Sequence, residues 1–307
     1  MYRKQRHHGA WKGRGAMKFP AARLSHPVVR DTRSTCSSRP RMGGGIALIL
    51  ILFLAGCATV AETGRQQIIL VSDQQLALAA NDSFARLRDA YPVIEEGPQA
   101  EMVRRVAQRL RPVVPPPPAG KTYDFVLFRN EEPNAFAMPN GDVGIFSGLF
   151  DRIVRTDDEL AAVLGHEIAH VTARHSAEQI SQRMLAAAGL AALSEATHND
   201  DLVTLMSAVA GVGFLLPFSR TQESEADRIG QLYMARACYD PAAAITVWER
   251  FARVGKRRPL TFLSTHPAPE KRMQRLRQWL AEAQAEYRRR CPPHRSPAMK
   301  PQEEAGS

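Results

Sequence analysis

The spacing of hydrophobic positions predicts a mainly helical protein. An N-cap at Ser72 and Asp73 precedes apolar residues at helical intervals, so we expect an amphipathic helix there and a second one over Pro98–Leu110. From Asp157 onward the helical spacing continues almost throughout the chain. Breaks are expected near residues 199–200, 217, 239–241 and 255–265.

One short part of the chain has the alternation of β-structure. Tyr123–Phe128 alternates as a strand, and Gly141–Phe146 is predicted to be its neighbour in a small antiparallel sheet. Turn residues at Pro139-Asn140-Gly141 precede the second strand. No repeat of about 20 to 50 residues is visible. Residues 72–291 are therefore expected to form one mainly α (α+β) domain, and the polar residues 292–307 a disordered tail.

The net charge becomes informative once it is located along the chain. The sequence carries 41 Lys and Arg against 31 Asp and Glu, for a net charge of +10. Residues 1–57 hold eleven of the basic residues and one acidic residue, Asp31, so the rest of the chain is neutral. A neutral folded part has no net field to attract phosphates, so no nucleic-acid partner is expected.

Residues 1–56 have the composition of a secretion signal. A basic stretch precedes the apolar run Ile46–Leu54 and the tetrapeptide Leu54-Ala55-Gly56-Cys57. About ten apolar residues span only ~15 Å as a helix, which is short for a permanent membrane span. The tetrapeptide resembles the bacterial lipobox, which implies cleavage before Cys57, lipidation of Cys57, and an anchor and tether over residues 57–71. Residue 58 is Ala and not Asp, which by resemblance to enterobacterial sorting rules favours the outer over the inner membrane. An uncleaved signal anchor is the alternative.

Two of the four cysteines remain for the folded part. Cleavage removes Cys36 and lipidation occupies Cys57, which leaves Cys238 and Cys291. An oxidising periplasm permits a disulfide between them. Two unrelated thiols are the alternative, because the sequence does not give the distance between their Cα atoms.

The strongest chemical signal is the motif His166-Glu167-Ile168-Ala169-His170 in the helix expected from Asp157. Histidines at i and i+4 project from one helix face, which is the spacing that grips one zinc ion. Zinc lowers the pKa of a bound water toward ~7, and Glu167 is the candidate general base for its proton. Burying both imidazoles beside Leu164 and Val171 without a partner would be costly, which favours a metal over a merely polar helix face.

A third ligand is expected from the downstream segment Glu223–Asp227. Glu223 can complete a His, His, Glu set, and Asp227 can hydrogen-bond the distal nitrogen of a ligating histidine. Glu225 is a rival, but it points about 200° around the helix from Glu223, so only one of them can face the metal, and we choose Glu223. The alternative is an acidic helix start stabilised by the helix dipole.

At this point the chain resembles the zinc peptidases of family M48, which include HtpX, the prenyl-protein endopeptidase and the periplasmic BepA-like peptidases. The resemblance covers most of residues 63–285. Its segments are Thr63-Gly64-Arg65 with Leu70-Val71-Ser72, Asn134-Ala135-Phe136-Ala137 with Pro139, Glu159–Gly165, Glu223–Asp227 with Gly230, and Ser264-Thr265-His266-Pro267 with Arg272. It implies a gluzincin-type zincin, with a small sheet beside the HExxH helix and one Zn²⁺ per chain held by His166, His170 and Glu223.

The resemblance also implies roles that the residues alone do not. Asn134–Ala137 resembles an edge strand on which the substrate backbone lies as an added strand. His266 resembles a histidine beside the metal that either stabilises the oxyanion or occupies the open coordination position as a self-inhibiting switch, and Arg272 resembles its basic partner. By the geometry of one continuous helix, His175 lies off the metal face, so we interpret it as structural.

These observations predict a lipid-anchored zinc endopeptidase at the periplasmic face of the outer membrane that cleaves unfolded or misassembled envelope proteins. The alternative is an outer-membrane assembly factor or chaperone with a latent or structural zinc site, and outer-membrane assembly machinery is an expected partner. A peptidase that faces the cytoplasm on an uncleaved anchor is a third reading. Unlike some members of the family, the sequence has apolar stretches that are too short or too interrupted for a multi-span membrane region. It also lacks a helical-repeat segment after Arg272, so functions that rely on such repeats are not expected.

Overall fold

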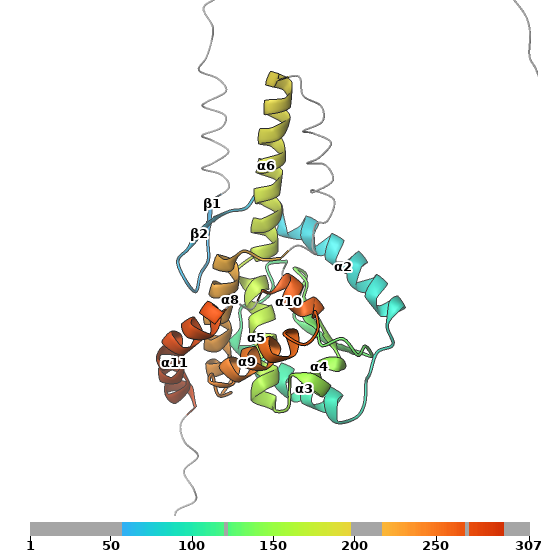
Figure 1. The fold of residues 1–307 in the computed structure, drawn as a ribbon, viewed down its shortest axis with the longest axis vertical. Coiled ribbons are helices and arrows are strands. Elements are labelled where there is room, and N and C mark those ends of the chain that lie inside the picture. Colours follow the sequence, from blue (N-terminus) through green and yellow to red (C-terminus); the bar gives the residue numbers. More distant parts are fainter. Residues whose placement is uncertain (1–56, 120–121, 198–216, 268–269, 292–307) are drawn as a thin grey trace, which may run out of the picture. The chain divides into compact units, whose positions relative to one another are not determined.

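A computed structural model of the protein describes residues 57–119, 122–197, 217–267 and 270–291 (Figure 1). The expected leader over residues 1–56 and the expected tail over 292–307 lie outside the described residues. In chain order the elements are β1 (Cys57–Thr59), β2 (Gln66–Ile68), α2 (Asp73–Ala90), α3 (Pro98–Leu110), the 3₁₀ helix η1 (Arg111–Val113), β3 (Asp124–Phe128), β4 (Ala135–Ala137), β5 (Asp142–Phe146), α4 (Gly148–Arg152), α5 (Asp157–Thr172), α6 (His175–Thr197), α8 (Arg220–Arg236), α9 (Ala243–Gly255), α10 (Thr261–Thr265) and α11 (Glu270–Arg290).

The first helices begin where the sequence predicts. Ser72 caps α2: its hydroxyl accepts the backbone N–H of Gln75, and the Gln75 side chain accepts the backbone N–H of Ser72. Pro98 occupies the first turn of α3, where its missing N–H costs nothing, and the helix ends at Leu110 as expected. The prediction of a mainly helical protein with one small sheet in this region is confirmed.

The sheet has the order β3-β5-β4. Strand β5 pairs antiparallel with β4, as expected of a small sheet beside the HExxH helix, but β5 runs parallel to β3. The expectation of antiparallel neighbours is therefore wrong for β3 and β5, because β4 intervenes in the chain and reverses its direction before β5 begins. Gly141, at φ +96°, closes the turn between β4 and β5, and its N–H bonds to the carbonyl of Met138.

Helix α5 lies at the centre of the packing and contacts α3, α8, α9 and β4 (Figure 1). Every residue from Glu159 to Val171 is buried, so the helix carries the histidine motif through the hydrophobic core. Helix α11 packs against α8 and α9 on the side away from the sheet. Among the described residues, no helix is both long enough and apolar enough to cross a membrane.

The helix that carries the motif ends earlier than the sequence suggested. Helix α5 stops at Thr172, and Arg174 adopts a left-handed backbone at φ +57° before α6 begins at His175. The expectation of one uninterrupted helix is wrong here, because a left-handed residue redirects the chain. This turn also changes the environment of His175.

The N-terminal residues of the described chain are more than a tether. Strands β1 and β2 form an antiparallel hairpin, and β2 contacts α6. Arg65 in the hairpin makes ion pairs with Glu178 on α6 and Glu225 on α8, and Glu62 pairs with Arg236 on α8. The buried carboxylates of Glu178 and Glu225 thus hold the hairpin against α6 and α8, and the lipid anchor at Cys57 stays a prediction.

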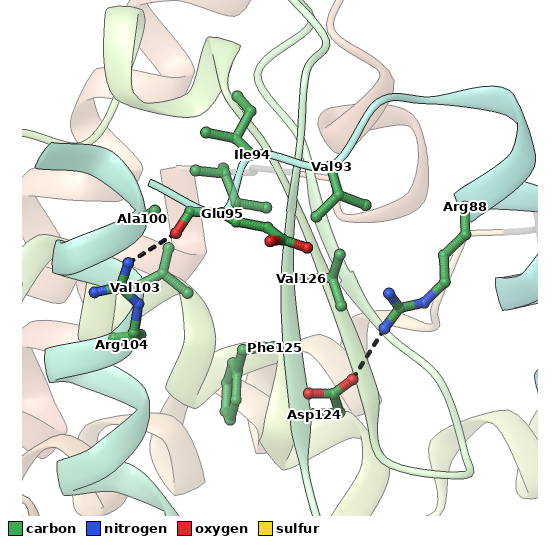
Figure 2. Close-up of a pocket in the computed structure, with 11 residues that line it drawn as sticks. Arg88, Val93, Ile94, Glu95, Ala100, Val103, Arg104, Asp124, Phe125 and Val126 are labelled. Atoms are coloured by element: carbon green, nitrogen blue, oxygen red, sulfur yellow. Dashed lines mark hydrogen bonds and ion pairs between the residues drawn. The ribbon is translucent and has the colours of Figure 1, made fainter. Parts of the chain in front are cut away.

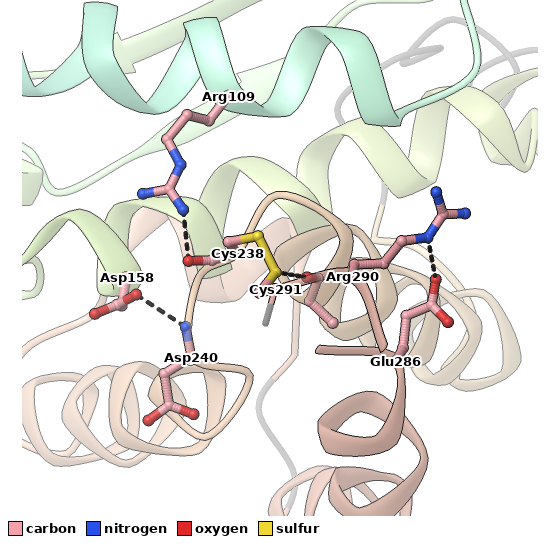
Figure 3. Close-up of a disulfide and its surroundings, with 8 residues drawn as sticks. Arg109, Asp158, Cys238, Asp240, Glu286, Arg290 and Cys291 are labelled. Atoms are coloured by element: carbon pink, nitrogen blue, oxygen red, sulfur yellow. Dashed lines mark hydrogen bonds and ion pairs between the residues drawn. A yellow bond between two sulfur atoms is a disulfide. The ribbon is translucent and has the colours of Figure 1, made fainter. Parts of the chain in front are cut away.

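A disulfide joins Cys238, just after the end of α8, to Cys291, just after the end of α11 (Figure 3). The guanidinium of Arg109 donates to the Cys238 carbonyl over 2.6 Å, and the Asp240 N–H donates to Asp158 over 2.9 Å. The chain after α8 is thus fixed both to α11 and to the start of α5.

Candidate active site

Four buried side chains from three parts of the chain meet at one point. His166 and His170 on α5, Glu223 on α8 and His266 after α10 each offer one ligand atom, and these atoms all lie within 4.8 Å of one another. The Nε2 atoms of the two motif histidines are 3.1 Å apart. Glu223 Oε1 lies 3.5 Å from His170 Nε2 and 3.0 Å from His266 Nδ1.

Asp227 contacts the ring nitrogen of His166 that faces away from the cluster. Its Oδ1 lies 3.1 Å from His166 Nδ1, as the sequence predicted for the residue one turn beyond Glu223. Burial raises the pKa of Asp227, but the charge and hydrogen bonds of Arg272 outweigh this effect and lower it. The ionised carboxylate can only accept, so the proton of His166 belongs on Nδ1 and the lone pair belongs on Nε2.

The spacing of the donors fits a zinc ion. Two nitrogens that each bind zinc at 2.0 to 2.1 Å in a tetrahedral arrangement lie ~3.3 Å apart, which is close to the separations of His166 Nε2 from His170 Nε2 (3.1 Å) and from His266 Nδ1 (3.3 Å). His166 Nε2, which carries a lone pair, lies 3.7 Å from the Glu223 carboxylate, and two acceptors this close repel one another. A divalent cation resolves that repulsion, and a His, His, Glu donor set suits zinc.

Arg272 lies at the site, as expected, and is paired with two of its carboxylates. It is 3% exposed, its Nε and Nη2 donate to Asp227 over 2.7 and 2.6 Å, and its Nη1 contacts Glu223. The guanidinium also lies over the Trp248 ring, 3.6 Å from the centroid. The donors of Arg272 are thus directed to Asp227, Glu223 and the Pro267 carbonyl, and a role of Arg272 at the oxyanion stays a prediction.

His175 and Glu225 are connected to the ligand cluster, which the sequence did not predict. His175 Nδ1 lies 2.9 Å from His170 Nδ1, and His175 Nε2 lies 3.0 Å from Glu225 Oε2. Burial raises the pKa of Glu225, but hydrogen bonds from His175, Thr63 and Arg65 lower it to about 2. Glu225 is not in the ligand cluster, as expected, but it is also not a solvated residue. The hydrophobic pattern does not mark the helix break at Arg174, and this break is what brings His175 back to His170.

Two aromatic side chains that the sequence gave no reason to single out complete the walls. Phe218 stacks on the His170 ring at 4.0 Å between centroids, and Trp248 meets the edge of the His166 ring at 5.3 Å. Such packing fixes the ring planes of the two ligands and keeps water from their faces.

Glu167 faces the cluster from α5 and is 2% exposed. Burial raises its pKa above the ordinary glutamate value, although the neighbouring histidines His266 and His166 oppose the shift. The backbone N–H of Ala137 donates to its carboxylate, and its Oε1 lies 3.6 Å from His266 Nε2. A carboxyl with a raised pKa beside the metal ligands suits a general base that later returns the proton.

Among the described residues, β4 is the outermost strand of its sheet on this side, and it lies beside Glu167. The Phe146 N–H bonds to the Asn134 carbonyl, and the Met138 N–H bonds to the Asp142 carbonyl. Because inward and outward groups alternate in an antiparallel pair, the N–H and C=O groups of Ala135 and Ala137 point away from β5. The predicted substrate strand Asn134–Ala137 therefore includes an edge strand next to Glu167.

An open pocket elsewhere on the molecule does not belong to this site. It lies between the end of α2, the segment that follows it, α3 and β3 (Figure 2). Arg88 pairs with Asp124 across it at 3.0 Å, and Arg104 donates to the Glu95 carbonyl at 2.8 Å. None of the clustered donor residues lines it.

A HExxH helix, a carboxylate from a second helix and a small sheet beside them define a zincin-type metallopeptidase. Residues 98–280 match the description Peptidase family M48, and the chain belongs to this family. Zinc is the cofactor of these metalloendopeptidases, and the matched residues include the whole donor cluster.

The chain is similar to curated relatives that carry two different names. Mitochondrial metalloendopeptidase OMA1 of Schizosaccharomyces pombe is 42% identical over 173 residues, 53% of this chain and 48% of the relative. OMA1 of Saccharomyces cerevisiae is 40% identical over 166 residues, 50% and 46% of the two chains. The Beta-barrel assembly-enhancing protease of Escherichia coli K12 is 34% identical over 205 residues, 62% and 41%. The chain spans about half or less of the length of these relatives.

Proposed function

We propose that this protein is a membrane-anchored zinc endopeptidase of the bacterial cell envelope that cleaves unfolded or misassembled proteins. The convergence of His166, His170 and Glu223, with Glu167 buried beside them, carries the proposal. These three residues would hold the ion, which supplies Lewis acidity toward a carbonyl and acidifies water when bound. Asp227 and Arg272 would keep the ligands oriented.

Glu167 is the residue we assign to proton transfer. Its carboxylate receives the Ala137 N–H, so its orientation is fixed at the point where the β4 edge meets the cluster. A peptide added along the outward groups of Ala135 and the outward carbonyl of Ala137 would bring a peptide bond beside Glu167. Recognition through backbone groups demands an extended chain but little sequence, which supports unfolded proteins as the substrate class.

Substitution of Glu167 tests the reaction. In the full-length protein, Glu167→Gln should retain zinc and lose cleavage of casein, because the amide keeps the shape of the side chain but cannot take up a proton. Zinc content and the rate of casein cleavage are the two measurements. Cleavage at the wild-type rate would remove Glu167 from this role.

The location at the periplasmic face of the outer membrane rests on the lipobox resemblance at Cys57 and on the basic leader. The names of the relatives give two precedents, one mitochondrial and one for β-barrel assembly. In a bacterial host, Cys57→Ala should release the protein from outer-membrane fractions. A variant that stays membrane-bound with residues 1–56 attached would favour the uncleaved anchor.

One observation favours a second candidate, an assembly factor whose site is latent. His266 stands among the metal donors as a fourth side chain, 3.3 Å from His166 Nε2, where it can fill the coordination position that a reacting group needs. If this is the working state, Glu167→Gln should restore the envelope of a deletion strain as well as wild type does. Failure of complementation would favour the peptidase.

A further inference from the structure

We propose that Glu225 and His175 are positioning residues of the zinc site, which hold His170 in the tautomer that binds metal, and that Arg65 of the β1–β2 hairpin fixes them in place. The inference rests on the metallopeptidase function proposed above, but none of the three residues belongs to the ligand set. Through Arg65, the β1–β2 hairpin would then contribute to zinc binding.

The direction of each hydrogen bond follows from Glu225. Its carboxylate accepts from Arg65 Nε over 2.7 Å and from the Thr63 hydroxyl, and it lies 3.0 Å from His175 Nε2. A carboxylate held by an arginine and a hydroxyl is an acceptor, so His175 must donate through Nε2. His175 is 0% exposed, and no solvent can offer it another arrangement.

The tautomer of His175 determines the tautomer of His170, the metal ligand beside it. A neutral His175 with its proton on Nε2 has a lone pair on Nδ1, which lies 2.9 Å from His170 Nδ1. His170 must then donate through Nδ1, and its lone pair is left on Nε2, the atom that faces His166 and Glu223. The hydrogen bonds from His170 to His175 and from His175 to Glu225 therefore fix the tautomer of His170, as Asp227 fixes that of His166 by direct contact.

Arg65 supplies the charge that makes the arrangement stable. Glu225 and Glu178 are 7% and 4% exposed, and Arg65 lies between them, with its Nη1 and Nη2 2.6 and 2.8 Å from the Glu178 oxygens. Two buried carboxylates this close require a cation. Arg65 lies outside the residues 98–280 that match the family, so the hairpin contributes to the site from beyond the matched domain.

The chain offers a matched control. Arg236 also joins the hairpin to α8, through Glu62 at 2.7 Å, and its side chain is 23% exposed, the same as that of Arg65. Within the part of the chain that the structure describes, Arg236 pairs with Glu62 and Glu286 and not with His175 or His170. Arg236→Met should therefore loosen the hairpin without disturbing the ligand, whereas Arg65→Met should disturb both.

The test compares zinc dissociation constants of the full-length protein and its variants by chelator competition, and visible absorption after replacement of zinc by Co²⁺. We expect His175→Leu to weaken zinc binding about 10- to 100-fold and to alter the cobalt spectrum. His175→Asn, whose amide oxygen can still accept from His170, should recover part of the loss. Arg65→Met should weaken binding by about 10-fold, and Arg236→Met should not.

Unchanged zinc affinity and cobalt spectrum in Arg65→Met would overturn the proposal, and so would equal losses in Arg65→Met and Arg236→Met. Because Arg65 is partly exposed, its variant keeps the test decisive even if His175→Leu does not fold. A wild-type protein that binds zinc but does not cleave casein would contradict the proposed function alone, since zinc affinity would still report on the three residues.

Discussion

Gly165 on α5 and Gly230 on α8 are in backbone contact where the two helices cross. A Cβ added to Gly230 would lie 3.0 Å from the His166 nitrogen and 3.1 Å from the Gly165 carbonyl carbon, which is closer than side chains normally approach. Gly230 follows Glu223 by seven residues and Asp227 by three, so all three share one face of α8. The contact sets the distance at which this face meets the histidines.

Gly230→Ala should therefore weaken zinc binding. The alanine favours the helix by about 1 kcal/mol, but its methyl group must push α8 from the rigid backbone of α5, at a cost of about 1–3 kcal/mol in packing and with displacement of Glu223. Zinc affinity and urea unfolding measure the two effects. Gly189→Ala on α6 is the control, because a Cβ there meets nothing within 4 Å. Equal zinc affinity in both variants would show that the crossing distance is not critical.

Short-range spacing was enough to predict most of the ligand set. His166 and His170 are one turn apart on a helix, and Glu223 precedes Asp227 by one turn on another, so each pair is fixed by local geometry. The role of His266 could be anticipated only by resemblance, because it reaches the cluster from a segment about 100 residues after His166, and sequence does not give that approach.

The errors came from backbone turns that the hydrophobic pattern does not encode. A single left-handed residue, Arg174, ends α5 and returns His175 to His170, whereas a continuous helix would carry His175 away. In the sheet, β3 lies parallel to β5 because β4 lies between them in the chain. The hairpin at Arg65 was missed because its partners, Glu178 and Glu225, are more than 100 residues away.

Arg272 provides a test of stability as well as of the site. Arg272→Met should lower the free energy of unfolding by about 3–5 kcal/mol, because it leaves the buried carboxylates of Asp227 and Glu223 without their cation. Arg272→Lys should lose less, since the charge remains but the paired contact with Asp227 does not. Urea unfolding and zinc affinity are the measurements. If Arg272→Met had normal stability but cleaved more slowly, this would support a role of Arg272 at the oxyanion.

The outward edge of β4 can be tested by removing one backbone donor. Ala137→Pro deletes an N–H that points away from β5 and donates to Glu167, so the sheet should persist. The KM for an extended substrate should rise by about tenfold, and kcat should also fall because Glu167 loses this contact. Zinc affinity should be unchanged. Phe136→Pro is the contrasting variant, because position 136 pairs with Gly144 inside the sheet, and it should destabilise the fold. An unchanged KM in Ala137→Pro would argue against strand addition.

The disulfide should stabilise the domain without acting on the zinc site. Cys238 and Cys291 are 53 residues apart in sequence, and opening a loop of this size costs about 2–4 kcal/mol of stability. Cys291→Ser should show this loss in urea unfolding and retain the zinc affinity of wild type. Addition of a reductant should lower the stability of wild type but not of Cys291→Ser. A reductant effect of equal size in both would place the sensitive bond elsewhere.

Acid should destabilise the protein in part through Glu159, which fixes the start of α5. Arg250 donates to both carboxylate oxygens over 2.7 and 2.8 Å, and the Arg155 N–H donates over 2.6 Å. Burial raises the pKa of Glu159, but these partners lower it below the ordinary value of 4.5.

Because the folded state holds the Glu159 carboxylate ionised, the unfolded state takes up this proton first as the pH falls. The contribution of Glu159 is therefore complete above about pH 4.5 and is lost as the pH falls through its lower folded pKa. Glu159→Gln should be less stable than wild type at pH 7, and the difference should shrink below pH 4.5. Glu249→Gln, which removes an exposed ion pair with Arg277, should change stability little at either pH. A difference between Glu159→Gln and wild type that stays constant with pH would mean that shape, rather than charge, anchors this end of the helix.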